Sequence, residues 1–134
     1  MRRMIFLSAA FVLASVLSAH AQSVPVKFLS AASTNSNLVH TGRTILRALA
    51  PVNTTTTIYY LKLYDKATAP VCGTDIPKWT LPIPFGPSNA GGGIAVPLDL
   101  SFPDGLGICL TGGVGDNDTS PAATGLVINL GYGS

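Results

Sequence analysis

An aspartate-rich segment late in the chain contains residue types that bind cations. Asp116 and Asp118 are separated by one residue, and this Asp-x-Asp spacing can offer oxygen ligands to calcium. An EF-hand loop would continue with a glycine and a glutamate at the positions where this chain has Pro121 and Val127. The alternative is a solvated turn whose aspartates cap backbone amides. A calcium site at Asp116 and Asp118 is one hypothesis, and a structural turn is the other.

Four aromatic side chains suggest a second kind of binding surface, one that stacks on sugar rings or on a protein partner. They are Tyr59, Tyr60, Tyr64 and Trp79. At strand spacing such residues also pack in a core or against a neighbouring strand. Both interpretations stay open at this point.

The residues that support catalysis are scarce. After residue 21 the chain has one histidine, His40, no glutamate, and six aspartates near turn-forming residues. A serine hydrolase needs a positioned base and a nucleophile elbow, and the Gly-x-Ser-x-Gly pattern does not occur. We therefore predict no catalytic residues and no enzyme activity. A small hydrolase that uses His40 is the competing hypothesis.

Cys72 and Cys109 are the only cysteines of the chain. In an exported protein two cysteines favour a disulfide, because the compartment is oxidising. The alternative is that Cys109 is a small buried residue on a strand and Cys72 a loop thiol. The pair is too isolated to form a zinc site with other Cys or His ligands.

The elements that must position these residues are short strands. Stretches rich in β-branched and aromatic residues alternate with clusters of Gly, Pro, Asn, Asp and Thr, a pattern typical of strands joined by turns. All 14 glycines and 10 prolines follow residue 21 and argue against a mainly helical chain. We predict strands near Val24–Leu29, Leu38–Val39, Thr44–Ala50, Thr57–Tyr64, Trp79–Ile83, Ile94–Leu100 and Leu106–Thr111, with Leu126–Tyr132 as an eighth candidate.

The alternation within Thr57–Tyr64 predicts one apolar face and one amphipathic face, the latter carrying Lys62 and Tyr64. Pro82 and Pro97 cannot donate to a ladder, so their segments are expected at sheet edges or bulges. Ser88–Gly93 is expected to be a loop. The predicted fold class is all-β, a single antiparallel β-sandwich or jelly-roll-like barrel of about seven or eight short strands.

The first 21 residues have the pattern of a cleavable export signal. Arg2 and Arg3 precede the apolar stretch Met4–Leu17, and Ala19 and Ala21 form the small-x-small cleavage pattern. The apolar stretch is too short for a membrane span. We expect residues 22–134 to form one domain that is secreted or periplasmic, with no membrane span after cleavage.

The distribution of charge argues against a nucleic-acid partner. After cleavage six lysines and arginines balance six aspartates, and the six cations are scattered along the chain. Nucleic-acid binding needs a concentrated basic patch, so no nucleic-acid partner is expected.

A set of short motifs resembles a family of small β-rich proteins encoded by tailed phages and prophages. The most specific is the run Tyr60-Leu61-Lys62-Leu63-Tyr64-Asp65-Lys66-Ala67, and the resemblance extends over roughly residues 30–134. Further pieces follow in order: Ala69-Pro70, Gly73-Thr74-Asp75-Ile76-Pro77, Ile83-Pro84, Phe102-Pro103-Asp104-Gly105, Leu110-Thr111-Gly112-Gly113 and Asp116-x-Asp118-Thr119. The resemblance implies a virion-associated or phage-derived β-sandwich without catalytic residues. The export signal departs from that family, because phage components assemble in the cytoplasm.

Together these features predict an exported, non-enzymatic β-sandwich that acts through surface contacts. Its expected partner is a protein or another component of the cell envelope, and a homo-oligomer is the second option. The competing functional hypothesis is a carbohydrate- or calcium-dependent binding module.

Overall fold

The computed structural model describes residues 22–86 and 91–134. The predicted export signal, residues 1–21, lies outside the described residues, as do Ser88–Ala90 of the predicted loop. The described chain is all-β and contains no helix. Its strands are β1 (Val24–Leu29), β2 (Asn37–Thr41), β3 (Thr44–Asn53), β4 (Tyr59–Asp65), β5 (Trp79–Ile83), β6 (Gly92–Gly93), β7 (Val96–Phe102), β8 (Gly105–Thr111) and β9 (Leu126–Gly133).

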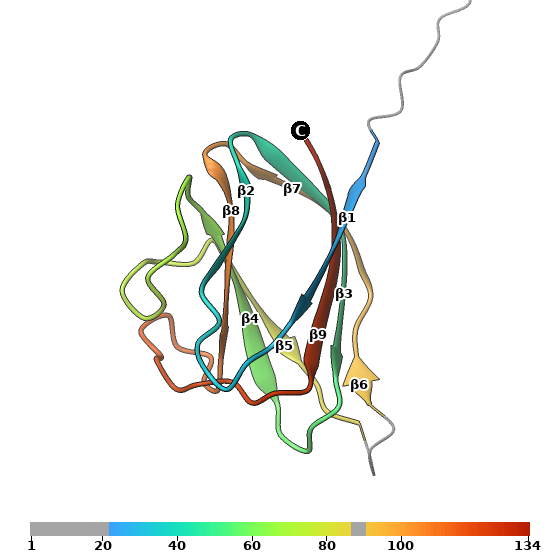
Figure 1. Ribbon diagram of the computed structural model, residues 1–134, viewed down its shortest axis with the longest axis vertical. Coiled ribbons are helices and arrows are strands. Elements are labelled where there is room, and N and C mark those ends of the chain that lie inside the picture. Colours follow the sequence, from blue (N-terminus) through green and yellow to red (C-terminus); the bar gives the residue numbers. More distant parts are fainter. Residues whose placement is uncertain (1–21, 87–90) are drawn as a thin grey trace, which may run out of the picture.

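The strands form two antiparallel sheets that pack face to face as a β-sandwich (Figure 1). The first sheet has the order β1-β9-β3, and both β6 and β7 pair with the far side of β3. The second sheet has the order β2-β8-β4-β5. The predicted fold class is confirmed. The chain crosses between the sheets after β1, β2, β3, β5, β7 and β8, so the two layers form one domain-wide core.

The core lies between the sheets and is made of leucine, isoleucine and phenylalanine side chains. In the second sheet Leu61 of β4 pairs with Leu110 of β8 and Leu81 of β5, which places all three on the inner face. Leu46 and Leu49 of β3 cover them from the first sheet. Residues directly opposite on antiparallel strands share a face, and this alternation produces one continuous apolar layer.

The prolines lie where a missing backbone donor can be tolerated. Pro82 lies on β5, an edge strand, and Pro97 lies on β7, next to an irregularity in its pairing with β3. Both positions match the sequence prediction. Gly92 and Gly93, expected in a loop, instead pair with Asn53 and Val52 as β6. Glycine suits this pairing because a Cβ on Gly93 would lie 2.5 Å from the Pro51 carbonyl oxygen.

The alternation predicted for β4 is confirmed, since Leu61 faces the core and Lys62 and Tyr64 lie on the opposite face. That amphipathic face is also buried, because Lys62 and Tyr64 are both 0% exposed. Alternation along one strand cannot predict this burial, because the covering residues come from two loops elsewhere in the sequence.

Candidate interaction surface

The outer face of the second sheet is a second buried layer. On this face Lys62 of β4 lies opposite Cys109 of β8, and Tyr64 lies opposite Gly107. Cys109 and Gly107 are buried as fully as the core residues. Two loops pack on this outer face and bury it.

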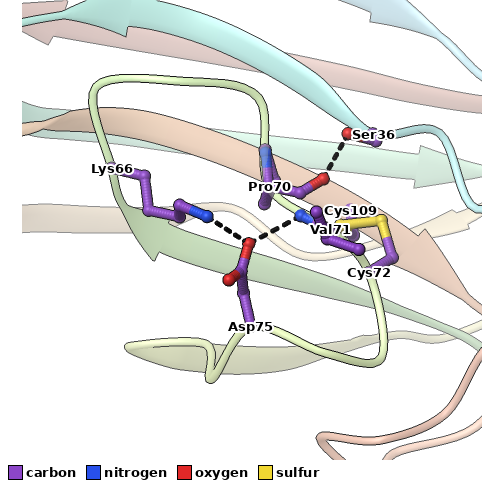
Figure 2. Close-up of polar contacts among 7 residues, drawn as sticks. All are labelled: Ser36, Lys66, Pro70, Val71, Cys72, Asp75 and Cys109. Carbon is purple, nitrogen blue, oxygen red and sulfur yellow. Dashed lines mark hydrogen bonds and ion pairs between the residues drawn. A yellow bond between two sulfur atoms is a disulfide. The ribbon is translucent and has the colours of Figure 1, made fainter.

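The first of these, residues 66–78 between β4 and β5, is called the covering loop here. A disulfide joins Cys72 of this loop to Cys109 on the sheet (Figure 2), with 6.0 Å between the Cα atoms. The predicted disulfide is confirmed, and the alternative of two separate thiols is wrong. Pro70 lies over Gly107, where a Cβ would be 2.8 Å from the Pro70 ring. The Ser36 hydroxyl donates to the Pro70 carbonyl oxygen and ties the same loop to the chain that precedes β2.

Asp75 organises the covering loop from within. Its carboxylate accepts hydrogen bonds from the Lys66 ammonium and from the Val71 backbone amide, as Figure 2 shows. The backbone amides of Thr74 and Asp75 both donate to the Val71 carbonyl oxygen, at 3.0 and 2.9 Å. The hydrogen bond from Lys66, followed by that from Val71, lowers the pKa of Asp75 below its ordinary value. The loop therefore has a shape that its own contacts define.

The second loop, residues 112–121 after β8, is called the acidic loop here. The Asp118 carboxylate accepts from the Gly113 amide at 2.8 Å and from the Ser120 hydroxyl at 2.6 Å. The hydrogen bond from Ser120 is the main cause that lowers the pKa of Asp118. This geometry is the capped turn that the sequence offered as an alternative to calcium binding.

A buried ammonium lies beneath the acidic loop. Lys62 Nζ donates to the Gly115 carbonyl oxygen. Burial lowers the pKa of Lys62, because the charged form loses its hydration, while Asp118 and then Asp116 act in the opposite direction. The two aspartates thus stabilise a positive charge that the protein itself supplies.

Tyr64 is the second buried titratable group of this layer. Its hydroxyl has no hydrogen-bond partner among the described residues. Burial, reinforced by the nearby carboxylates of Asp75 and Asp116, raises the pKa of Tyr64 to about 12. An unpartnered buried hydroxyl is a cost to folding.

The two loops touch each other at Gly73. A Cβ on this glycine would lie 2.3 Å from the Thr119 methyl carbon and 3.2 Å from the Asn117 carbonyl oxygen. Gly73 also has a φ of +82°, a conformation that other residues adopt at a cost. Glycine is required here for both reasons, and the two loops form one continuous cover.

The four aromatic residues that were predicted to form a binding surface lie on two different faces of the second sheet. Tyr59 and Trp79 lie on the inner side of the second sheet, where Tyr59 packs against the core and Trp79 is 43% exposed at its margin. Tyr60 and Tyr64 lie on the outer side, and Tyr64 is 0% exposed. The four side chains therefore do not form one stacking platform.

The predicted calcium ligands lie together in the acidic loop. Asp116 is exposed, whereas one carboxylate oxygen of Asp118 is occupied by the two hydrogen bonds described above. Within residues 22–86 and 91–134, no three His, Cys or Asp side chains gather as a set that could hold a metal ion. The Lys62 ammonium beside them competes electrostatically with any added cation.

His40 makes a hydrogen bond and a ring contact that connect parts of the fold. Its Nδ1 lies 2.9 Å from the Thr44 hydroxyl oxygen, and that hydroxyl donates to the Gly42 carbonyl oxygen at 2.8 Å. Since the single hydroxyl hydrogen is used in this way, Nδ1 of His40 is the donor to Thr44. The imidazole also lies 4.7 Å from the Tyr132 ring, centroid to centroid, which links β2 of one sheet to β9 of the other.

Apolar side chains are exposed on the two loops. Val71 and Ile76 of the covering loop are 57% and 82% exposed, and Val114 of the acidic loop is 62% exposed. We call these three side chains the loop face. Loops that are fixed by a disulfide and by internal hydrogen bonds can present such side chains with little entropy left to lose on binding. The sequence signal for them is a β-branched apolar residue beside a Gly or a Pro, outside the predicted strands.

A shallow, open hollow lies on the outer side of the first sheet. It has a volume of about 310 Å³ and is lined mainly by small or apolar residues of β1, β3 and β9, among them Pro25, Ala48, Ala50 and Gly131. Its lining contains no titratable side chain, and its polar side chains are Ser23 and Asn129.

No protein-family model, curated protein or solved structure matches this chain. Among the described residues there is no helix long and apolar enough to cross a membrane.

Proposed function

We propose that this protein is exported and acts, without catalysis, by binding a protein or another component of the cell envelope through the loop face. The observation that carries the proposal is the exposure of Val71 and Ile76 on a loop that a disulfide fixes to the sheet, together with that of Val114 on the neighbouring acidic loop. A rigid support reduces the conformational entropy that exposed apolar groups lose on binding.

The disulfide also supports export. Disulfides persist in oxidising compartments, and the segment Arg2 to Ala21 has the sequence pattern of a secretory signal. The resemblance to small phage proteins supports a structural role, taken over for use outside the cytoplasm. Intact mass of the protein recovered from an exporting host tests this part. We expect a chain that begins at Gln22 and weighs about two hydrogens less before reduction than after it.

The contact role is tested with two variants of matched chemistry. Ile76→Asp places a charge on the loop face, and Leu29→Asp places one on β1 of the other sheet, at a side chain that is 62% exposed. We would measure self-association by sedimentation velocity and co-sedimentation with purified envelope vesicles. Ile76→Asp is expected to weaken the association that the wild type shows, and Leu29→Asp to leave it unchanged. Equal behaviour of the two variants would contradict the proposal.

A carbohydrate- or calcium-dependent binding module is the second proposal, and the structure gives it less support. Its best remaining elements are the exposed margin of Trp79 and the exposed carboxylate of Asp116. A calcium titration followed by thermal unfolding tests the metal part, because a ligand that binds the folded state raises Tm. An unchanged Tm at millimolar calcium would remove it.

A further inference from the structure

The layer beneath the two loops is separate from the hydrophobic core. The core cluster consists of side chains between the sheets, and it includes no residue of the covering loop or of the acidic loop. The side chains that the loops cover are polar or titratable, chiefly Lys62 and Tyr64. Uncovering this layer would therefore leave the sandwich core intact.

Backbone hydrogen bonds from Lys66 to Gly105 and from Lys78 to Leu63 attach the two ends of the covering loop to the sheet, and other contacts hold its middle. They include the Cys72–Cys109 bond, the packing of Pro70 on Gly107, and the hydrogen bond from Ser36 to Pro70. The bonds that Asp75 makes to Lys66 and Val71 lie within the loop and do not attach it to the sheet. The disulfide is the strongest of these attachments, because it is covalent.

The buried groups favour opening. Lys62 loses hydration and gains one carbonyl hydrogen bond and the attraction of Asp118 and Asp116. The Tyr64 hydroxyl loses hydration and gains no partner among the described residues. Both groups recover hydrogen bonds with water when the cover lifts. The disulfide opposes this by keeping the loop near the sheet at all times.

We propose that the Cys72–Cys109 disulfide is a redox latch: its reduction releases the covering loop and exposes Lys62 and Tyr64 while the sandwich stays folded. The reductant is a dithiol. Two of its thiols are oxidised to a disulfide, and the two electrons and two protons that they give up convert the Cys72–Cys109 bond into two thiols. Because Gly73 packs against Thr119, release of the covering loop also removes support from the acidic loop. The latch does not depend on the contact role proposed above.

Pulse labelling of amines tests the latch directly. The oxidised and the dithiothreitol-reduced protein are exposed briefly to an acetylating N-hydroxysuccinimide ester, and acetylation of each lysine is quantified by peptide mass mapping. Lys27, an exposed residue of β1, is the internal reference. We expect reduction to raise the labelling rate of Lys62 relative to Lys27 by about tenfold or more, as for a site that becomes exposed by local opening. Alkylation of the new thiols verifies that the bond was cleaved.

Two further measurements separate a latch from a purely structural bond. Backbone amide exchange in β3 and β9 reports on the core and is expected to stay slow after reduction. The Cys72→Ala/Cys109→Ala variant is expected to label at Lys62 as the reduced wild type does, with no further change on adding dithiothreitol. An unchanged Lys62 rate after verified reduction would overturn the proposal. So would simultaneous loss of protection in β3 and β9, because that would mean global unfolding.

Discussion

At the scale of single residues, the main finding is that the protein buries two titratable groups outside its core. Lys62 and Tyr64 follow the strand alternation that the sequence predicts, but they face a cover and not solvent. Their pKa values shift in opposite directions, lower for the lysine and higher for the tyrosine, because burial disfavours the charged form of each.

Removing the Tyr64 hydroxyl is expected to stabilise the protein. Tyr64→Phe deletes a buried hydroxyl that has no partner among the described residues, and we expect a gain of about 1 kcal/mol in the free energy of unfolding at pH 7. Chemical denaturation measures it, with Tyr59→Phe on the opposite face of β4 as the control. A loss of stability in Tyr64→Phe would show that the hydroxyl does have a partner.

The same residue makes stability depend on alkaline pH. The pKa of Tyr64 is about 12 in the folded state and about 10 in an unfolded chain, so between these values the folded state binds more protons. Its contribution to stability is therefore complete below pH 10 and decreases as pH rises towards 12. We expect Tyr64→Phe to lose less stability than the wild type between pH 9.5 and 11.5. Parallel curves for the two proteins would contradict this assignment.

Asp75 makes the stability of the protein decrease as the pH falls into the acidic range. Its pKa is lowered in the folded state, so its contribution to stability is present above the ordinary value near 3.8 and disappears as pH falls through the folded value. Asp75→Asn keeps an acceptor for the Val71 amide but loses the charge that Lys66 contacts. We expect the variant to have a lower Tm than the wild type at pH 7 and a similar Tm near pH 2. Asp99→Asn, at an exposed ion pair with Arg47, is the control.

At the scale of elements, Asn53 links the two sheets. This residue ends β3 and is 0% exposed. Its amide nitrogen donates to the carbonyl oxygens of Thr57 and Ile83, at 2.8 and 3.1 Å, and its amide oxygen accepts from the Thr55 amide and hydroxyl. One side chain thus shapes the connection to β4 and also holds the end of β5.

Truncating Asn53 should therefore destabilise the fold more than its size suggests. Asn53→Ala leaves the Thr57 and Ile83 carbonyl oxygens without this donor, and we expect a loss of about 2–4 kcal/mol in the free energy of unfolding. Asn129→Ala is the matched control, since Asn129 is half-buried and donates one hydrogen bond, to the Ala50 carbonyl oxygen. Similar losses in the two variants would argue against the linking role of Asn53.

Local features of the fold could be predicted from the sequence, whereas the burial of the outer face of the second sheet by the two loops could not. Pro82 and Pro97 indicated edges and irregular pairing because the missing donor is a property of the residue itself. The number of cysteines and the expected compartment favoured the Cys72–Cys109 bond over two separate thiols. The burial of Lys62 could not be predicted from β4 alone, since it depends on how residues 66–78 and 112–121 fold back onto the sheet.

The candidate residues show the same limit. Alternation along β4 already places Tyr59 on the face opposite Tyr60 and Tyr64, whereas the register is needed to place Trp79 on the face of Tyr59. Asp118 has a residue type that suits calcium, yet its environment is set by Ser120 and Gly113 of its own turn. Residue type defines which chemistry is available, and the fold determines which neighbours use it.

At the scale of the whole molecule, the disulfide ties the covering loop to a central strand. It closes a loop of the chain that spans 37 residues in sequence separation, and the chain-entropy model gives it a stabilising effect of about 3–4 kcal/mol. We expect Cys72→Ala/Cys109→Ala to lose this amount in chemical denaturation while it keeps the far-UV circular dichroism of the wild type. An unfolded variant would show that the sandwich needs the bond in order to form.

The pairing of the first strand with the last has a mechanical consequence. β1 and β9 are antiparallel neighbours, with Val24 opposite Tyr132, so the start of β1 and the end of β9 lie at the same end of the sandwich (Figure 1). Tension applied between Val24 and Tyr132 would load their hydrogen bonds one pair after another, as in a zipper, and not all together as in shear. The protein should therefore yield at low force when pulled in this direction, so an attachment that carries load would have to act elsewhere on the molecule.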